Sequence, residues 1–258
     1  MASTIKDCME NIINYHAEPE KCPICGKEFV PTKIKFLNKE RVIYCRDCNC
    51  LEEKEQREKE EERRRKREER LRLKYQRANI GKRYIDMTLD KLEAMKTENI
   101  AAAKKYVEEF NPVSGASLHL LGEFGNGKTS VGYAILRELL ENGYNGIYVT
   151  WLDIVNRFYY AKSFNSEEKI DGVLVDLSNF DIIVIDEFVI NLKDEREINL
   201  ATELFDRLYR DNKCFILINN PCDIADMKAV PRLGKLLDRV REQADKLIFK
   251  HSSYRKGV

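Results

Sequence analysis

A glycine-rich loop constrains the fold of this chain more than any other feature. Residues 122–129 read GEFGNGKT and fit the pattern G-x-x-x-x-G-K-[ST]. An apolar stretch at 117–121 precedes the loop and predicts a strand, and the spacing of 128–141 predicts a helix. In this setting glycines let backbone N–H groups surround phosphates, and the helix N-terminus adds its positive end. A glycine-rich turn that arose by chance would not require a strand before it and a helix after it, so this alternative is disfavoured.

The loop therefore predicts an ATP site that uses Mg²⁺. We expect Lys128 to reach the β- and γ-phosphates and the Thr129 hydroxyl to bind the metal. The expected ATP-binding residues are Gly122, Glu123, Phe124, Gly125, Asn126, Gly127, Lys128, Thr129 and Ser130.

Two adjacent acids end a second apolar stretch, IIVIDE at 182–187. Packing of a buried strand does not require neighbouring carboxylates at its end. Asp186 is expected to hold Mg²⁺, directly or through water, and Glu187 to polarise the attacking water as a general base. One carboxylate would serve binding alone, so the pair predicts an ATPase.

A third apolar stretch, 214–218, ends in Asn219 and Asn220. An amide there could orient the water or the γ-phosphate, although asparagine is also favoured as a helix cap. Its position at the same sheet edge favours a catalytic role for Asn220, but the choice between Asn219 and Asn220 stays open.

Strands and helices alternate from residue 79 onward. Further helices are expected at 99–110, 152–162, 167–177, 195–210 and 230–241, and further strands at 146–150 and 247–250. This alternation predicts an α/β domain with a doubly wound parallel sheet. Ligands of such sheets bind at the carboxyl ends of the strands, where the glycine-rich loop and the acidic pair lie.

Five of the eight cysteines lie between residues 22 and 50. Their C-x₂-C…C-x₂-C arrangement predicts a structural Cys₄ zinc site, since no histidine or carboxylate is placed to leave an open position. So short a segment cannot build a core, and metal would supply about 10 kcal/mol of its folding free energy. The expected ligands are Cys22, Cys25, Cys48, and either Cys45 or Cys50.

Residues 51–77 are almost all charged and contain neither glycine nor proline. Opposite charges recur at helical spacing, and no apolar face is available for burial. We expect a solvated helix that acts as a semi-rigid spacer, in preference to a DNA-binding helix. The chain thus divides into a partner-binding zinc module at 1–50, a charged helical linker at 51–77 and an ATPase domain at 78–258.

No apolar run is long enough to span a bilayer, and the first residues lack a signal-peptide core. These features predict a cytoplasmic protein with reduced cysteines. The net charge of +1 provides no overall attraction to nucleic acid or membranes, so any basic surface would have to be local.

Several segments of the chain resemble the DnaC/DnaI family of replicative helicase loaders, a branch of the AAA+ ATPases. The segments that carry the resemblance are 78–84, 106–110, 176–187, 237–241 and 253–255. A cysteine module followed by a charged helix is similar to loaders of phage and Gram-positive type. Two departures are Ile-Asn-Asn in place of the family's Thr-Ser-Asn, and the lack of a lid domain after Arg241, for which Arg255 is a weak stand-in.

The resemblance implies an ATP-dependent protein that loads a DnaB-type hexameric helicase onto single-stranded DNA, with ATP binding and hydrolysis as the switch. It also implies that the zinc module grips the helicase and that partners stimulate a weak ATPase. Arg239 matches the arginine that reaches the ATP of a neighbouring subunit, which implies self-association through the ATP sites. By helical spacing Arg239 lies off the apolar stripe of its helix and is expected to be exposed.

The helix expected at 152–162 mixes aromatic and basic residues that could stack and pair with single-stranded DNA. An apolar stripe along this helix assigns Phe158 and Tyr159 to packing. The remaining DNA candidates are Arg157, Tyr160 and Lys162.

Two other classes of P-loop protein compete with the loader. An IstB-like transposition helper ATPase has the same core but no zinc module in its usual pattern. A small-molecule kinase would need an arginine-rich lid and would lack adjacent Asp and Glu, so the sequence disfavours it.

Overall fold

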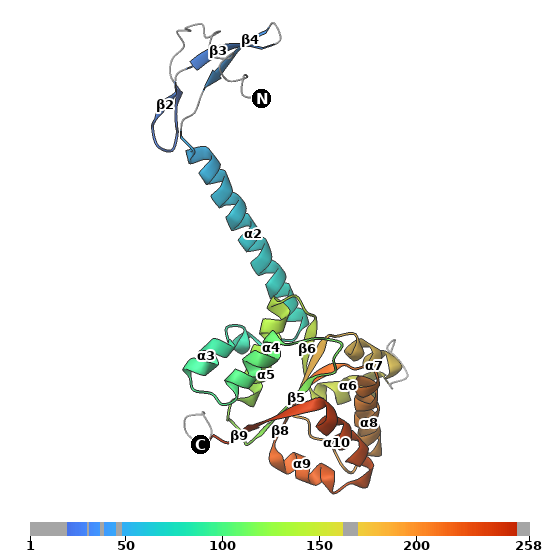
Figure 1. Ribbon diagram of the computed structural model, residues 1–258. Helices are drawn as coiled ribbons and strands as arrows, with labels where there is room; N and C mark the ends of the chain where they lie inside the picture. Colours follow the sequence, from blue (N-terminus) through green and yellow to red (C-terminus); the bar gives the residue numbers. More distant parts are fainter. Residues whose placement is uncertain (1–19, 30, 37–38, 45–47, 162–169, 252–258) are drawn as a thin grey trace. The chain divides into compact units, whose positions relative to one another are not determined.

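The structure is a computed structural model that describes residues 20–29, 31–36, 39–44, 48–161 and 170–251 (Figure 1). The chain divides into two compact units, Met1–Glu69 and Arg70–Val258. None of the described helices combines the length and apolar character needed to cross a membrane.

The first unit contains two short antiparallel hairpins and most of a long helix. The strands are β1 (Glu20–Lys21), β2 (Glu28–Phe29), β3 (Pro31–Phe36) and β4 (Lys39–Tyr44), with β1 paired to β2 and β3 to β4. The turn between β1 and β2 carries Cys22 and Cys25. Gly26 ends this turn at a φ of +72°, in the left-handed region that favours glycine.

The charged segment forms one helix, α2 (Cys50–Arg77), as predicted. Exposed i,i+4 ion pairs line it, including Lys66 to Glu62 at 2.7 Å. Such pairs stabilise a helix by a few tenths of a kcal/mol each. The prediction that α2 buries nothing is wrong for its last two turns. Tyr75 is buried there, and its hydroxyl bonds to Glu141 within the second unit.

A five-stranded sheet of order β6-β7-β8-β5-β9 forms the centre of the second unit, and every neighbouring pair is parallel. The strands are β5 (Ser117–Gly122), β6 (Gly146–Thr150), β7 (Ile182–Asp186), β8 (Cys214–Asn219) and β9 (Ala244–Phe249). The predicted doubly wound α/β architecture is confirmed. The glycine-rich loop follows β5, an inner strand between β8 and β9, and lies at the same edge of the sheet as the carboxyl ends of β7 and β8.

Helices cover both faces of this sheet and bury two separate apolar cores. One core contains side chains of α3 (Leu89–Ala94), α4 (Ile100–Glu108) and α5 (Lys128–Glu141). The other contains side chains of α6 (Trp151–Ala161), α7 (Ile170–Ser178), α8 (Glu195–Arg210) and α10 (Gly234–Gln243).

Three short helices of the described chain were not expected from the sequence. They are η1 (Lys82–Tyr84), α3 and α9 (Pro221–Lys228). Pro221 occupies the first turn of α9, and Asn220 and Asp223 form a capping box at its start. The helix predicted at 230–241 begins with η2 (Pro231–Leu233) and continues as α10.

Candidate nucleotide site and cysteine cluster

The glycine-rich loop wraps around the ammonium group of Lys128. Its Nζ donates to the carbonyl oxygens of Gly122 and Glu123, both at 2.6 Å, and to Oδ1 of Asn126 at 3.1 Å. Gly127 has a φ of +94°, and a Cβ on Gly122 would lie 2.4 Å from the Phe249 carbonyl oxygen. Both positions therefore require glycine. Burial lowers the pKa of Lys128, while the charge of Asp186 opposes this.

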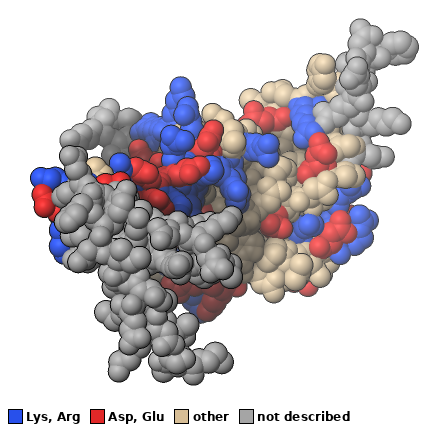
Figure 2. Space-filling view, turned by 90° about the horizontal axis from the view of Figure 1, so that it is seen from above, with Lys and Arg blue, Asp and Glu red and all other residues tan. Residues whose placement is uncertain are grey.

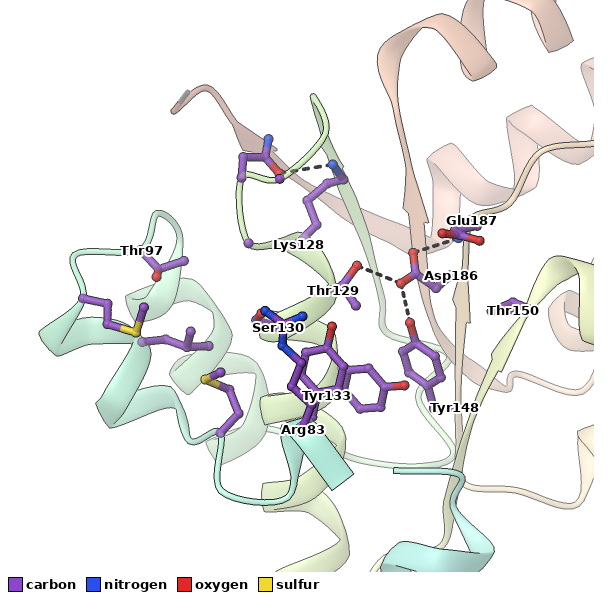
Figure 3. A pocket seen from close by; sticks show the side chains of 17 residues that line it. Arg83, Thr97, Lys128, Thr129, Ser130, Tyr133, Tyr148, Thr150, Asp186 and Glu187 are labelled. Carbon is purple, nitrogen blue, oxygen red and sulfur yellow. Dashed lines mark hydrogen bonds between the residues drawn. The ribbon is translucent and has the colours of Figure 1, made fainter. Parts of the chain in front are cut away.

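Thr129 and Asp186, the two expected metal ligands, meet at the carboxyl edge of the sheet. Thr129 Oγ1 donates to Asp186 Oδ2 at 2.8 Å (Figure 3). The Tyr148 hydroxyl donates to the same oxygen. The Asp186 side chain is buried, whereas Thr129 lies in the first turn of α5. A hydroxyl beside a carboxylate is a set of hard oxygen donors that fits Mg²⁺.

Glu187 follows Asp186 and lines the same pocket. Its residue is exposed, and its backbone N–H donates to Asp186 Oδ1 at 2.7 Å. Its φ of +50° lies in the left-handed region, which non-glycine residues rarely adopt and which is enriched at active sites. The two adjacent acids thus differ in burial, with Asp186 buried and Glu187 exposed.

The two asparagines after β8 have different surroundings. Asn219 is buried, with Oδ1 3.2 Å from His119 Nε2, and its amide donates to the Phe188 carbonyl. Burial lowers the pKa of His119 to about 4, so the ring is neutral at pH 7. Asn220 instead presents Oδ1 to Lys128 Nζ at 3.4 Å while also capping α9. Asn220, not Asn219, therefore faces the glycine-rich loop.

A pocket of about 700 Å³ opens beside these groups. The loop, Thr150, Asp186 and Glu187 line its polar side (Figure 3). The opposite wall comes from residues that precede the sheet in sequence, namely Arg83, Tyr84, Met87, Leu92, Met95 and Thr97. Sequence reasoning missed this wall, although the 78–84 segment was a signal. An apolar wall opposite phosphate-binding groups suits a nucleotide, which is apolar at its base and charged at its phosphates.

The family of IstB-like ATP binding proteins matches residues 44–257. The chain belongs to this family. The replicative helicase loader DnaC of Escherichia coli K12 is 30% identical over 164 residues, which are 62% of this chain and 64% of that protein. An insertion-sequence ATP-binding protein of Sinorhizobium fredii is 28% identical over 107 residues, 42% of this chain and 35% of that protein. The chain thus spans less than two thirds of the length of these relatives.

Solved structures share the AAA+ fold of this IstB-like chain. The DnaC helicase loader has a TM-score of 0.57 at 21% identity, covering 66% of this chain and all of that one. The replication initiator DnaA bound to AMPPCP and single-stranded DNA has a TM-score of 0.52 at 16% identity, covering 67% and 51%. DnaI has a TM-score of 0.50 at 16% identity, covering 68% and 94%. At these identities the likeness shows the fold alone.

Arg239 lies away from the nucleotide pocket of this IstB-like domain. It is on α10, forms an ion pair with Asp206 of α8, and places its guanidinium 5.2 Å from the centre of the Tyr209 ring. Only 18% of its side chain is exposed, so the prediction of an exposed arginine is wrong. Helical spacing places Arg239 outside the apolar stripe of α10. However, α8 packs beside α10, and its Asp206 and Tyr209 side chains cover the arginine.

The DNA candidates lie on or just after α6. Arg157 forms an ion pair with Asp176 of α7, and Tyr160 is 65% exposed. Phe158 is buried, in agreement with its assignment to packing, and the Tyr159 hydroxyl donates to Asp194. Lys162 lies outside the described residues, as does Arg255.

Four cysteine sulfurs gather at the start of the described chain. The Sγ atoms of Cys22, Cys25, Cys48 and Cys50 all lie within 4.8 Å of one another. Backbone N–H groups of Cys25 and Ile24 lower the pKa of the Cys22 thiol to about 7, whereas the neighbouring Cys25 thiol raises the pKa of Cys50 to about 12. Four thiols this close fit tetrahedral zinc. Cys45 lies outside the described residues, so the described set contains Cys50 as its fourth member.

Proposed function

We propose that this chain is an ATP-dependent DNA replication protein that binds a DnaB-type hexameric helicase and loads it onto single-stranded DNA. ATP binding and hydrolysis act as the switch. The observation that carries the proposal is its 30% identity over 164 residues to the replicative helicase loader DnaC. It is supported by a cysteine cluster that begins outside the region matched by the IstB-like family.

The ATP chemistry follows from the groups around the pocket. Loop residues from Gly122 to Ser130 would bind the phosphates through backbone N–H groups, with Lys128 supplying the cation. Mg²⁺, held by Thr129 and Asp186, would neutralise charge on the β- and γ-phosphates. Glu187 would polarise the attacking water, and Asn220 would orient the water or the γ-phosphate.

The domain roles form a second part of the proposal. Residues 1–50 would be the helicase-binding module, residues 51–77 a charged helical linker, and residues 78–258 the AAA+ ATPase domain. A structural zinc held by Cys22, Cys25, Cys48 and Cys50 would stabilise the module. The close approach of the four sulfurs supports this assignment.

A zinc variant tests the module. Purified parent protein should contain about one zinc per chain. Cys22→Ser should lose most of that zinc and its co-elution with a DnaB-type helicase, because a structural zinc supplies the folding free energy of so small a module. ATP affinity should stay within about twofold of the parent, since the pocket lies in the second unit. Elemental analysis and gel filtration provide the measurements.

Cys222→Ser is the matched control, because Cys222 is an exposed thiol outside the cluster. It should retain zinc, helicase binding and ATP binding. A parent protein that is folded in residues 1–50 without zinc, or a Cys22→Ser protein that binds helicase normally, would refute the role of the metal.

An IstB-like transposition helper is the second candidate function. It is favoured by the family description and by the match to the insertion-sequence protein, which covers only 107 residues. The longer match to DnaC and the cysteine cluster favour the loader. Stimulation of the ATPase by a transposase on duplex DNA, without helicase binding, would reverse this order.

A contact with single-stranded DNA is proposed at Arg157, Tyr160 and Lys162. On the face shown in Figure 2, basic and acidic side chains are interspersed, so the described part of that face offers no broad basic patch. The exposed ring of Tyr160 is available for stacking.

The double variant Tyr160→Ala, Lys162→Ala should bind single-stranded DNA roughly 5- to 150-fold more weakly, because one stacked base contributes about 1–3 kcal/mol. Fluorescence anisotropy at matched salt measures this change. Lys91→Ala, an exposed lysine on α3, should bind like the parent. Parent-like affinity in the double variant would remove these residues from the DNA site.

A further inference from the structure

An aromatic stack in the pocket is not explained by phosphate binding. The Tyr84 ring stacks on Tyr133 with 4.1 Å between centroids, and Tyr133 stacks on Tyr148 at 3.8 Å. The interplanar angles are 11° and 13°. Tyr148 is buried, and its hydroxyl reaches Asp186 (Figure 3). The stack therefore extends from the wall before the sheet to an expected metal ligand.

The register of the sheet explains why Tyr148 meets Asp186. On the parallel strands β6 and β7, Tyr148 pairs with Val184, and Thr150 pairs with Asp186. Residues two apart on a strand share a face, so Tyr148 and Asp186 lie on the same face of the sheet. Thr129 and Tyr133 meet this face from α5, one helical turn apart. Two contacts result, Thr129 with Asp186 and Tyr133 with Tyr148.

The Tyr148 hydroxyl limits how the carboxylate can rotate. Oδ2 of Asp186 accepts from both Thr129 and Tyr148, and Oδ1 accepts from the Glu187 backbone. The phenol is the donor in its bond to Asp186, since the carboxylate can only accept. When Thr129 turns toward a metal, Tyr148 can continue to hold the carboxylate.

We propose that Tyr148 is a positioning residue that orients the Asp186 carboxylate toward Mg²⁺, and that Tyr133 fixes the Tyr148 ring for this task. The inference rests on the proposed Mg²⁺–ATP site and adds a residue that no loop or acidic motif contains. A tyrosine in a buried strand would otherwise be a packing residue. In that case its hydroxyl would have no effect on the metal.

The Tyr148→Phe variant tests the proposal because it keeps the ring stack and removes only the hydroxyl. Binding of a fluorescent ATP analogue is titrated with Mg²⁺ and, separately, measured in EDTA. The Mg²⁺ concentration at half-maximal enhancement should rise about tenfold or more, as is usual when a residue that orients a metal ligand is removed. Affinity in EDTA should be unchanged. Tyr144→Phe, which loses a hydroxyl bonded to the Phe110 carbonyl, is the matched control and should show no shift.

Measurements on the parent protein distinguish failure of the proposed Mg²⁺–ATP site from failure of the positioning role of Tyr148. If Mg²⁺ does not strengthen ATP binding by the parent, the proposed Mg²⁺–ATP site itself fails. If the parent responds to Mg²⁺ and Tyr148→Phe responds identically, only the positioning role is overturned. Should Tyr148→Phe not fold by circular dichroism, Tyr133→Leu replaces it. That variant frees the Tyr148 ring and should shift the Mg²⁺ midpoint in the same direction, and an unshifted midpoint would overturn the proposal.

Discussion

The Glu187→Gln variant should bind ATP with parent affinity and hydrolyse it about a hundredfold to ten-thousandfold more slowly. General-base catalysis contributes rate factors of this size, and glutamine cannot accept the proton of the attacking water. Binding should survive because Lys128, Thr129 and Asp186 are unchanged. The exposed position of Glu187, separated from Asp186 by a left-handed turn, leaves its carboxylate available for water.

Single-turnover hydrolysis and equilibrium binding of ATP measure the two effects separately. Glu195→Gln is the matched control, since Glu195 is an exposed acid on α8 paired with Arg232, and it should hydrolyse ATP normally. Lys128→Ala should lose nucleotide binding, because it removes the one side-chain cation of the glycine-rich loop. Equal ATP turnover in Glu187→Gln and the parent would falsify the assignment of the base.

The Arg239→Ala variant should bind ATP normally and lose most of the hydrolysis that depends on self-association. An arginine inserted into a neighbouring site stabilises charge on the transferred phosphoryl group and contributes about 10³–10⁵ in rate in other P-loop enzymes. In the single chain Arg239 pairs with Asp206 and lies over Tyr209. To reach the ATP of a neighbouring chain, Arg239 would have to exchange these partners for the phosphates. Its catalytic role, that of an arginine finger, would therefore depend on self-association.

Hydrolysis by the parent should therefore rise more than linearly with protein concentration, while Arg239→Ala should lose this dependence. Mixing Arg239→Ala with Lys128→Ala should restore some activity, because the Lys128→Ala chain still carries an intact arginine. Arg241→Ala is the control on the same helix, where Arg241 is exposed and paired with Asp238. If Arg239→Ala behaves like the parent at every concentration, with or without helicase and DNA, the finger lies elsewhere, with Arg241 and Arg207 next.

The loop and the acidic pair could be found in the sequence because each is a local pattern. Glycines at 122 and 127 reflect close approach and left-handed backbone, and Asp186 follows an uninterrupted apolar strand. The parallel sheet then brings these patterns together, because the carboxyl ends of its strands share one edge. The order of the strands was not predicted, because it depends on pairing between segments that are distant in sequence.

The remaining features depend on contacts between distant segments. In the sequence, Tyr148 cannot be distinguished from an aromatic residue of the core. Only the pairing of Thr150 with Asp186 shows that the Tyr148 hydroxyl lies beside the Asp186 carboxylate. Arg239 was expected to be exposed because helical periodicity identifies a helix's own apolar stripe, but it does not reveal an acid on α8. Asn220 illustrates a third limit, since one side chain both caps α9 and faces Lys128.

A helicase-loading assay tests whether this chain is an ATP-switched helicase loader. The purified chain is mixed with the DnaB-type helicase of the same organism and circular single-stranded DNA, and helicase bound to the circles is measured after gel filtration. The parent protein with ATP should place helicase on the DNA, whereas Lys128→Ala and Cys22→Ser should not. The proposal would be contradicted if the same amount of helicase were recovered on the circles with and without the parent protein, and if the two proteins formed no complex.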